Sequence, residues 1–119
     1  MAWQPFSAGR LRERVTFQAR AVVDDGYGNE VSGPWEDQFT VAANIAPARG
    51  REEVLAQRLQ GVRPVEITVR WSSQTVQIQP DWRAVNARKP EEIYNIHDIR
   101  DPDGKRAWNV LTCSLGTAT

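Results

Sequence analysis

The chain has 119 residues, of which 40% are hydrophobic and 25% charged, and its 15 basic and 15 acidic side chains give a formal net charge of zero. This length suits one domain with a single core. The charge balance argues against a protein that binds duplex DNA mainly by neutralising phosphates, although a local patch could still touch DNA.

A net charge near zero also favours self-association, because little repulsion keeps copies apart. The single cysteine, Cys113, excludes an intrachain disulfide, so the fold needs no oxidising compartment. No apolar run is long enough to span a bilayer, and the N-terminus lacks the basic and apolar segments of a signal peptide. We therefore expect synthesis in the cytoplasm and no membrane partner.

The first half of the chain predicts an arm, two strands and a wide loop. Residues 1–11 are aperiodic and predict a flexible N-terminal arm that a partner orders, leaving 12–119 as a single β-barrel domain. Residues 12–19 and 36–46 alternate between apolar and polar side chains, as half-buried strands do. The link from Val22 to Pro34 is dense in turn-forming residues and predicts a loop.

The segment from Pro47 to Pro64 changes period. Within it, residues 50–60 carry one narrow apolar face and predict a helix of roughly three turns. We expect this helix to cap one end of the barrel or to lie at an interface between subunits. Its apolar side chains Leu55 and Leu59 would be buried, and its polar side chains Glu52, Glu53, Gln57 and Arg58 would be exposed.

The second half of the chain predicts further short strands over 65–71, 75–79, 82–87, 92–99 and 107–115. Turns are predicted at Pro80-Asp81, at Lys89-Pro90 and over 101–105. Together these elements predict a mainly β protein: a small closed antiparallel β-barrel of six to seven strands, with one short α-helix inserted between strands two and three. The alternation places five side chains in its interior: Phe17, Val41, Ile67, Val69 and Trp71.

No residue pattern points to catalysis, a cofactor or a metal. His97 is the only histidine, and metal sites need several ligands. Cys113 lies in an alternating apolar strand and is interpreted as a small buried hydrophobic residue, since no basic partner for a nucleophile is evident. The pattern Gly26-Tyr-Gly28 is too short for a phosphate loop and predicts a turn. We expect a protein that is not an enzyme.

A series of alternate arginines, Arg10, Arg12 and Arg14, would share one face of the first strand. One interpretation is a solvated strand face. The other is an interface, because arginine forms bidentate pairs with carboxylates. The acidic loop from Asp24 to Glu30 could supply those carboxylates from a neighbouring subunit.

Short motifs follow one another in a set order along the chain. The opening Gly-Arg-Leu-Arg-x-Arg-Val stands at Gly9 to Val15, followed by an Asp-x-Tyr-Gly-x-Glu loop from Asp25 to Glu30 and by Trp35. This order resembles that of the head-tail joining proteins of long-tailed bacteriophages. Later matches cover nearly the whole chain: Ala43, Ile45, Pro47, Gly50, Glu52, Arg70, Trp71, Asp81, Arg83, Val85, Tyr94, Ile96, Trp108, Leu111 and Cys113. The turn at Lys89-Pro90-Glu91 departs from the family, which often has glycine there.

The resemblance implies a head-closure, or connector, protein of the virion neck. Such a subunit forms a homo-oligomeric ring under the portal and adaptor proteins, retains the packaged DNA without sequence-specific binding, and provides the docking surface for the tail. Phages, prophages and gene transfer agents use similar parts. The alternatives are a tail-completion or other neck protein with a related barrel, or a small-barrel nucleic-acid-binding module. The expected interface residues are Arg10, Arg12, Arg14, Asp24, Asp25, Tyr27, Glu30, Glu52, Glu53 and Arg58.

Overall fold

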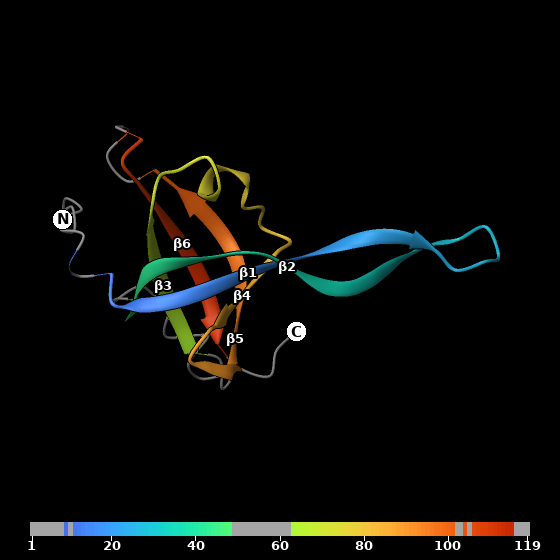
Figure 1. Cartoon of the computed structure of the whole chain (residues 1–119), viewed down its shortest axis with the longest axis horizontal. Helices are drawn as coiled ribbons and strands as arrows, with labels where there is room; N and C mark the ends of the chain where they lie inside the picture. Colours follow the sequence, from blue (N-terminus) through green and yellow to red (C-terminus); the bar gives the residue numbers. More distant parts are fainter. Residues whose placement is uncertain (1–8, 10, 49–62, 102–103, 105, 116–119) are drawn as a thin grey trace.

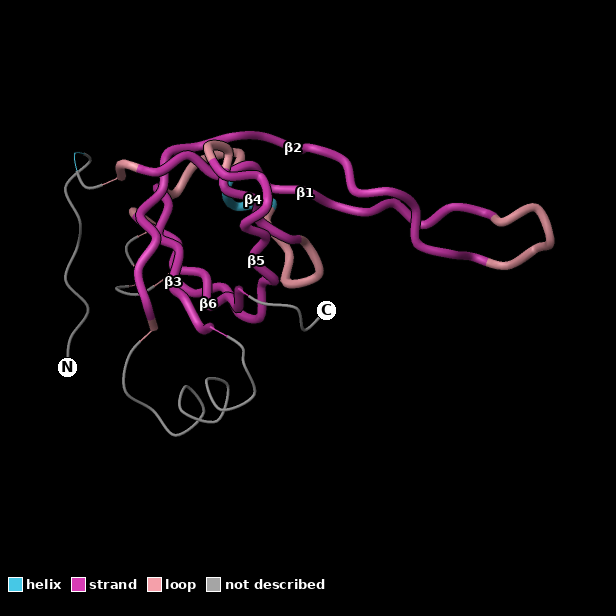
Figure 2. The backbone as a smooth tube through the Cα atoms, turned by 90° about the horizontal axis from the view of Figure 1, so that it is seen from below, coloured by secondary structure: helices cyan, strands magenta, loops and turns pink. Residues whose placement is uncertain are grey.

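The computed structural model describes residues 9, 11–48, 63–101, 104 and 106–115. Six antiparallel strands and one 3₁₀ turn occupy most of this part (Figure 1): β1 (Glu13–Asp24), β2 (Glu30–Pro47), β3 (Arg63–Arg70), η2 (Thr75–Gln77), β4 (Arg83–Asn86), β5 (Lys89–Arg100) and β6 (Trp108–Leu115). The strands pair in the order β1-β2-β3-β6-β5-β4 and close into a barrel, seen as a ring in Figure 2. The predicted mainly β, antiparallel architecture is confirmed, with six strands in the described residues.

The barrel interior is filled by the apolar side chains of the alternating strands. These residues form one cluster: Val15, Phe17, Ala43, Val65, Ile67, Val69, Ile78, Ala84, Tyr94, Ile96, Leu111 and Cys113. Successive side chains in a strand point to opposite faces, so this set is what a period of two places inside. Closing the ring leaves no free edge in the barrel wall itself, because each wall strand is bonded on both sides.

Three of the five predicted interior residues, Phe17, Ile67 and Val69, are fully buried. Val41 is partly buried and packs against the cluster. The prediction for Trp71 was wrong: β3 ends at Arg70, and the Trp71 side chain is only partly buried outside the core cluster. The alternation of β3 does not extend to this residue because it has already left the strand.

The largest difference from the sequence-based expectation is the link from Val22 to Pro34. It is not a loop. β1 runs on to Asp24 and β2 begins at Glu30, so only a short turn separates them. The resulting hairpin projects well beyond the barrel (Figures 1 and 2). The turn-forming residues of this link lie partly at the tip of the hairpin and partly in its second strand.

The hairpin leaves the barrel because its outer part has no third strand beside it. β4 bonds to β1 only from Val15 to Gln18, and β3 bonds to β2 only from Asn44 to Pro47. The β1–β2 register also shifts twice, between Phe17 and Gln18 and between Arg20 and Val22. Such bulges bend a strand and increase its twist, which turns the hairpin away from the barrel wall.

Gly33 and Pro34 lie at the second register shift, where the hairpin tolerates them. A side chain at Gly33 would meet the carbonyl oxygen of Ala21 at 3.0 Å and Cγ1 of Val23 at 3.2 Å, so the facing strand lies against bare backbone here. Proline within a sheet is found at edges and bulges because it donates no ladder hydrogen bond. The two residues thus mark a bulge rather than a loop.

Two smaller predictions were also wrong. Residues 75–79 contain the 3₁₀ turn η2 and no strand, and Val76 is 47% exposed. Thr75 fixes this turn, since its hydroxyl donates to the carbonyl of Arg70 at 2.6 Å. The predicted turn at Lys89-Pro90 lies inside β5, and the chain turns just before it, at residues 87–88.

Several predicted features lie outside the described residues. They are the helix over 50–60 with Glu52, Glu53 and Arg58, most of the N-terminal arm with Arg10, and part of the turn over 101–105. Among the described residues, no helix is long and apolar enough to cross a membrane.

The core assignment predicts a clear ranking of substitutions. Phe17→Ala removes a fully buried ring and should lower the free energy of unfolding by about 3–5 kcal/mol. Trp71→Ala should cost distinctly less, and the control Val76→Ala should stay within about 0.5 kcal/mol of the wild type. Urea unfolding followed by circular dichroism measures all three. Equal midpoints for Phe17→Ala and Val76→Ala would contradict the interior placed here.

Candidate functional site

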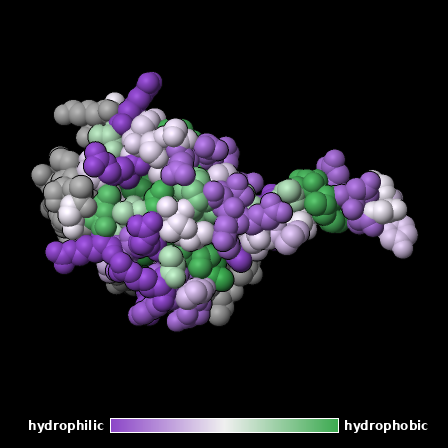
Figure 3. All heavy atoms as spheres, viewed as in Figure 1, coloured by the Kyte–Doolittle hydropathy of each residue, from purple (hydrophilic) through white to green (hydrophobic). Residues whose placement is uncertain are grey.

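The outer part of the β1–β2 hairpin, residues 19–36, is called the distal hairpin below. Every residue from 20 to 32 is exposed. Its valines are unusual for a surface: Val22 is 67% exposed, Val23 41% and Val31 42%. Figure 3 shows an apolar patch on the projection. A two-stranded hairpin with no core beneath it is marginally stable alone. The distal hairpin therefore has the properties of a surface that packs on another molecule.

Hydrogen bonds from the backbone to two aspartate carboxylates fix the tip of the distal hairpin. The Asp24 carboxylate accepts the backbone N–H of Gly26 at 2.9 Å, and the Asp25 carboxylate accepts that of Tyr27 at 2.7 Å. Gly26 and Gly28 have φ values of 88° and 83°, which favour glycine. The tip is therefore a defined turn and not a flexible loop.

This turn presents one aromatic ring among negative charges. Tyr27 is 88% exposed at its apex. The backbone hydrogen bond from Tyr27 contributes most to lowering the pKa of Asp25, so this carboxyl group stays ionised at neutral pH. With Asp24 and Glu30, the segment 24–30 carries three carboxylates and no basic side chain.

A tryptophan with two guanidinium groups against its ring forms the root of the distal hairpin. The Cζ atom of Arg20 lies 5.1 Å from the Trp35 ring centroid, and that of Arg83 lies 4.5 Å from it. Cation–π contacts contribute about 0.5–2 kcal/mol each. Because Arg83 belongs to β4 of the barrel wall, these contacts attach the projecting hairpin to the barrel.

Hydrogen bonds hold both arginines in place. Arg20 Nε donates to the carbonyl of Gly33 at 2.7 Å, across the second bulge. Arg83 Nε donates to Gln18 Oε1 at 2.7 Å, and the Gln18 amide donates to Asp37 Oδ1 at 2.7 Å. Burial, and then the nearby charge of Arg20, lower the pKa of Arg83. Two like charges are thus kept close together by a network of fixed donors and acceptors.

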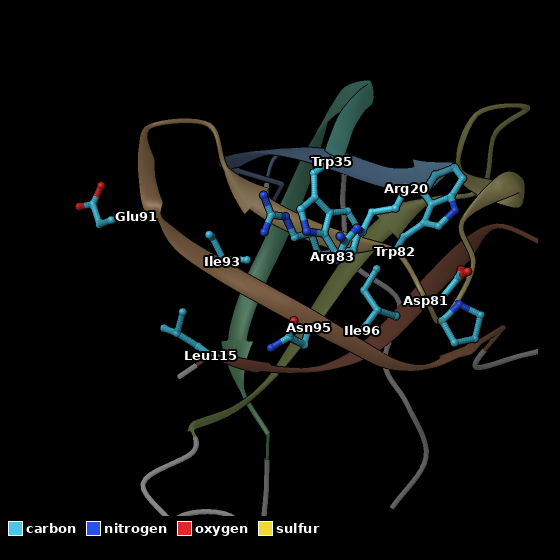
Figure 4. A pocket seen from close by; sticks show the side chains of 11 residues that line it. Arg20, Trp35, Asp81, Trp82, Arg83, Glu91, Ile93, Asn95, Ile96 and Leu115 are labelled. Carbon is cyan, nitrogen blue, oxygen red and sulfur yellow. The ribbon is translucent and has the colours of Figure 1, made fainter. Parts of the chain in front are cut away.

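A groove of about 680 Å³ opens beside this root (Figure 4). It runs from the root of the distal hairpin across β4 and β5 to the end of β6. Its lining mixes aromatic, aliphatic and charged side chains: Arg20, Trp35, Pro80, Asp81, Trp82, Arg83, Glu91, Ile93, Asn95, Ile96 and Leu115.

The charges in the groove are separated along its length. Figure 4 shows the two arginines beside Trp35 in its central part, with Asp81 toward one end and Glu91 toward the other. Within the described residues, neither Arg20 nor Arg83 makes an ion pair. The centre of the groove is therefore a cationic, aromatic surface with carboxylates at its ends.

The groove is also connected to the barrel core. The Phe17 and Phe39 rings lie 5.4 Å apart between centroids, and the Phe39 and Trp82 rings 6.1 Å apart. Since Phe17 is fully buried and Trp82 lines the groove, a continuous row of aromatic rings supports the groove floor from within. This packing connects the groove floor to the barrel core.

The predicted interface residues fall into two separate regions. Asp24, Asp25, Tyr27 and Glu30 come together at the hairpin tip. Arg12 and Arg14 are exposed at the opposite end of β1, so the two regions are separated by roughly ten extended residues, or about 33 Å. An Arg–carboxylate contact between them cannot form within one chain. The remaining candidates, Arg10, Glu52, Glu53 and Arg58, lie outside the described residues.

Cys113 packs in the barrel core, and His97 contacts the neighbouring strand β6. Cys113 is fully buried, as predicted, and burial raises the pKa of its thiol to about 12, so it is a neutral group at physiological pH. His97 Nε2 lies 2.7 Å from the hydroxyl of Ser114. In the described part of the chain, no group of three or more His, Cys, Asp or Glu side chains is arranged to hold a metal ion.

Sequence reasoning missed the groove and its cationic centre. Trp35 and Arg83 belong to separate sequence motifs, and Arg20 belongs to none of them. Their contact depends on the register that places β4 beside β1 at Gln18 and Arg83, which no local pattern reveals. A usable signal was the high tryptophan count of five, because large aromatic residues concentrate in cores and at interfaces.

The family comparison matches the model of the phage head completion proteins over residues 6–116. The chain belongs to the phage head completion protein family. It is therefore a structural protein of a phage-type virion, which confirms the class implied by the sequence motifs. No curated protein sequence matches the chain.

Two solved structures have folds similar to that of this chain. Protein SF1141 from Shigella flexneri 2a has a TM-score of 0.68 at 24% identity, covering 96% of this chain and 100% of that one. A chain from the virion of a native gene transfer agent particle has a TM-score of 0.63 at 16% identity, covering 91% and 96%. Both likenesses concern the fold.

The root contacts predict which substitution frees the distal hairpin. Trp35→Ala removes the ring that both guanidiniums contact, so amides in residues 19–36 should exchange with solvent at least about tenfold faster, for a loss of 1.4 kcal/mol or more. Amides of β3 and β6 should be unchanged. Hydrogen exchange with mass spectrometry measures both, and Trp35→Phe, which keeps an aromatic ring, is the matched control. Uniform acceleration across the barrel would show that Trp35 supports the whole fold instead.

Proposed function

We propose that this protein is a head-closure subunit of the virion neck. It assembles as a ring under the portal and adaptor, retains the packaged DNA, and offers the surface on which the tail or a tail-completion protein docks. Family membership supports a structural role in completing heads. The observation that carries the finer assignment is the distal hairpin, whose exposed valines and tyrosine lie outside the core cluster of the described chain.

Assembly on a preformed platform suits the way the molecule is divided. The barrel is a closed unit with its own core, so the subunit can stay folded while it is free. The distal hairpin gains packing only when another protein covers it, so its exposed side chains become buried on incorporation. The exposed Arg12 and Arg14 at the other end of β1 form a second surface for a partner.

The charge balance suits a protein that DNA must pass. A ring with a strong basic excess would bind the exiting duplex through its phosphates, whereas this chain has a formal net charge of zero. The solved chain of similar fold from a gene transfer agent virion supports a place in such a particle. Phage, prophage and gene transfer agent remain equivalent sources for this role.

The alternative of a nucleic-acid-binding module has weaker support. Such modules stack bases on free aromatic faces along a basic groove. Here the Trp35 ring is already contacted by Arg20 and Arg83, and carboxylates lie at both ends of the groove. A tail-completion role uses the same surfaces, and the position in the particle separates it from head closure.

Removal of the distal hairpin tests the proposed function. Residues 21–34 are replaced by a two-residue Asn-Gly turn between the paired residues Arg20 and Trp35, which keeps the barrel and the root. We expect a folded protein that no longer completes DNA-filled heads made without it. Completion is measured as DNase-resistant DNA and as tails attached in vitro. The matched control is Val76→Ser, an exposed change outside the hairpin.

The two readouts separate the parts of the proposal. The wild-type protein should protect the DNA and permit tail attachment, and the truncated protein should do neither. Full completion by the truncated protein would refute the assembly role of the hairpin. Failure of the wild-type protein to protect DNA would refute head closure itself.

A further inference from the structure

We propose that the groove beside Trp35 receives the distal hairpin tip of a second copy of this chain, so that the subunits join head to tail. This inference rests on the proposed ring function and identifies the surfaces that form the ring. The occupant is the segment 24–30, and its recognition would use the opposite charges of the tip and the centre of the groove together with burial of the Tyr27 ring.

The hairpin tip and the centre of the groove carry opposite charges. The tip carries Asp24, Asp25 and Glu30 with no basic side chain, and the centre of the groove carries Arg20 and Arg83 with no ion pair to a described residue. Arginine groups close to one another are stabilised by an incoming carboxylate, which arginine can bind in a bidentate manner.

Hydrogen bonds hold both the groove arginines and the hairpin tip in place before the two surfaces meet. Both arginine side chains are fixed by hydrogen bonds from Nε, to the Gly33 carbonyl and to Gln18 Oε1. The tip is fixed by the hydrogen bonds that Asp24 and Asp25 accept from its own backbone. Two surfaces that are ordered before contact lose little conformational entropy when they bind. Arg12 and Arg14 are exposed and do not line this groove.

Geometry requires that the contact be between chains. The tip lies at the far end of the distal hairpin and the groove lies at its root (Figures 1 and 4). About seven extended residues separate them, or roughly 23 Å, so a straight hairpin cannot return its own tip to its own groove. A tip and a groove on different parts of one surface give a heterologous contact, which repeats from subunit to subunit and closes into a ring when the rotation allows.

The carboxylates at the ends of the groove define how the tip would enter. Asp81 and Glu91 would repel the acidic tip from either end, so its favourable position is the central part beside Trp35. There the Tyr27 ring would meet the apolar lining provided by Trp82, Ile93 and Ile96. An exposed aromatic ring that enters a pocket is the usual anchor of a protein interface.

Photo-crosslinking tests the contact directly. The protein carrying p-benzoylphenylalanine in place of Tyr27 is added to DNA-filled heads that lack it, and the heads are irradiated after completion. We expect a covalent product of two chains, with the crosslink mapped by mass spectrometry to the groove peptides around Trp82 or Ile93. Crosslinks only between two tips, only to other virion proteins, or none on completed heads would overturn the inference.

Charge reversal gives an independent test. Glu30→Arg and Arg20→Glu should each lower the yield of completed heads by at least about tenfold, because each brings like charges together at the contact. The double variant restores opposite charges and should recover to within about threefold of the wild type. The matched control is Asp98→Arg, which reverses the charge of an exposed residue outside the groove. Circular dichroism checks that each variant is folded.

The outcomes distinguish this inference from the proposed function. Recovery in the double variant supports the head-to-tail contact. If the double variant stays as defective as the single variants while the wild-type protein completes heads, the tip does not bind the groove, although the head-closure role stands. If the wild-type protein completes no heads, the proposed function fails first.

Discussion

The short pairing of β1 with β4 is the constraint on which the rest of the structure depends. Four residue pairs, from Val15 to Gln18 on β1, close the barrel against β4. Where that pairing stops, β1 and β2 continue with each other alone and become the distal hairpin. The same few hydrogen-bonded pairs therefore seal the core and determine where the projection begins. Arg83, at the last of these pairs, then contacts Trp35 and attaches the hairpin to the wall.

This arrangement separates stability from assembly. The barrel buries Phe17, Ile67 and Leu111 completely, and its core cluster includes no residue of the hairpin tip. The hairpin exposes valines and a tyrosine that contribute nothing to that core. A core confined to the barrel, with exposed apolar side chains on a projecting element, suits the assembly role proposed for this member of the phage head completion family. The neutral overall charge, in turn, leaves recognition to local groups of opposite charge.

The sequence predicted the elements whose side chains alternate and pack. Phe17, Ile67 and Val69 were placed correctly because burial of one strand face imposes a period of two. The distal hairpin was mistaken for a loop because it buries neither face, which leaves no alternation, and because Gly33-Pro34 indicates a loop as strongly as a bulge. Trp71 was misplaced because its strand ends one residue earlier.

The candidate site was likewise predicted only where it depends on local sequence. Its tip was predicted correctly as an acidic turn with Tyr27, since turn chemistry is local. The groove could not be predicted, because Arg20, Trp35 and Arg83 meet only through pairing between strands distant in the sequence. Long-range register is set by the whole barrel and not by any one segment.

The most direct test of this account is electron cryomicroscopy of DNA-filled heads completed with the wild-type protein. We expect a ring of barrels at the DNA exit, with each distal hairpin lying on the neighbouring barrel beside its Trp35. Barrels that are absent from the exit, or hairpins that extend into solvent without touching another protein, would contradict it.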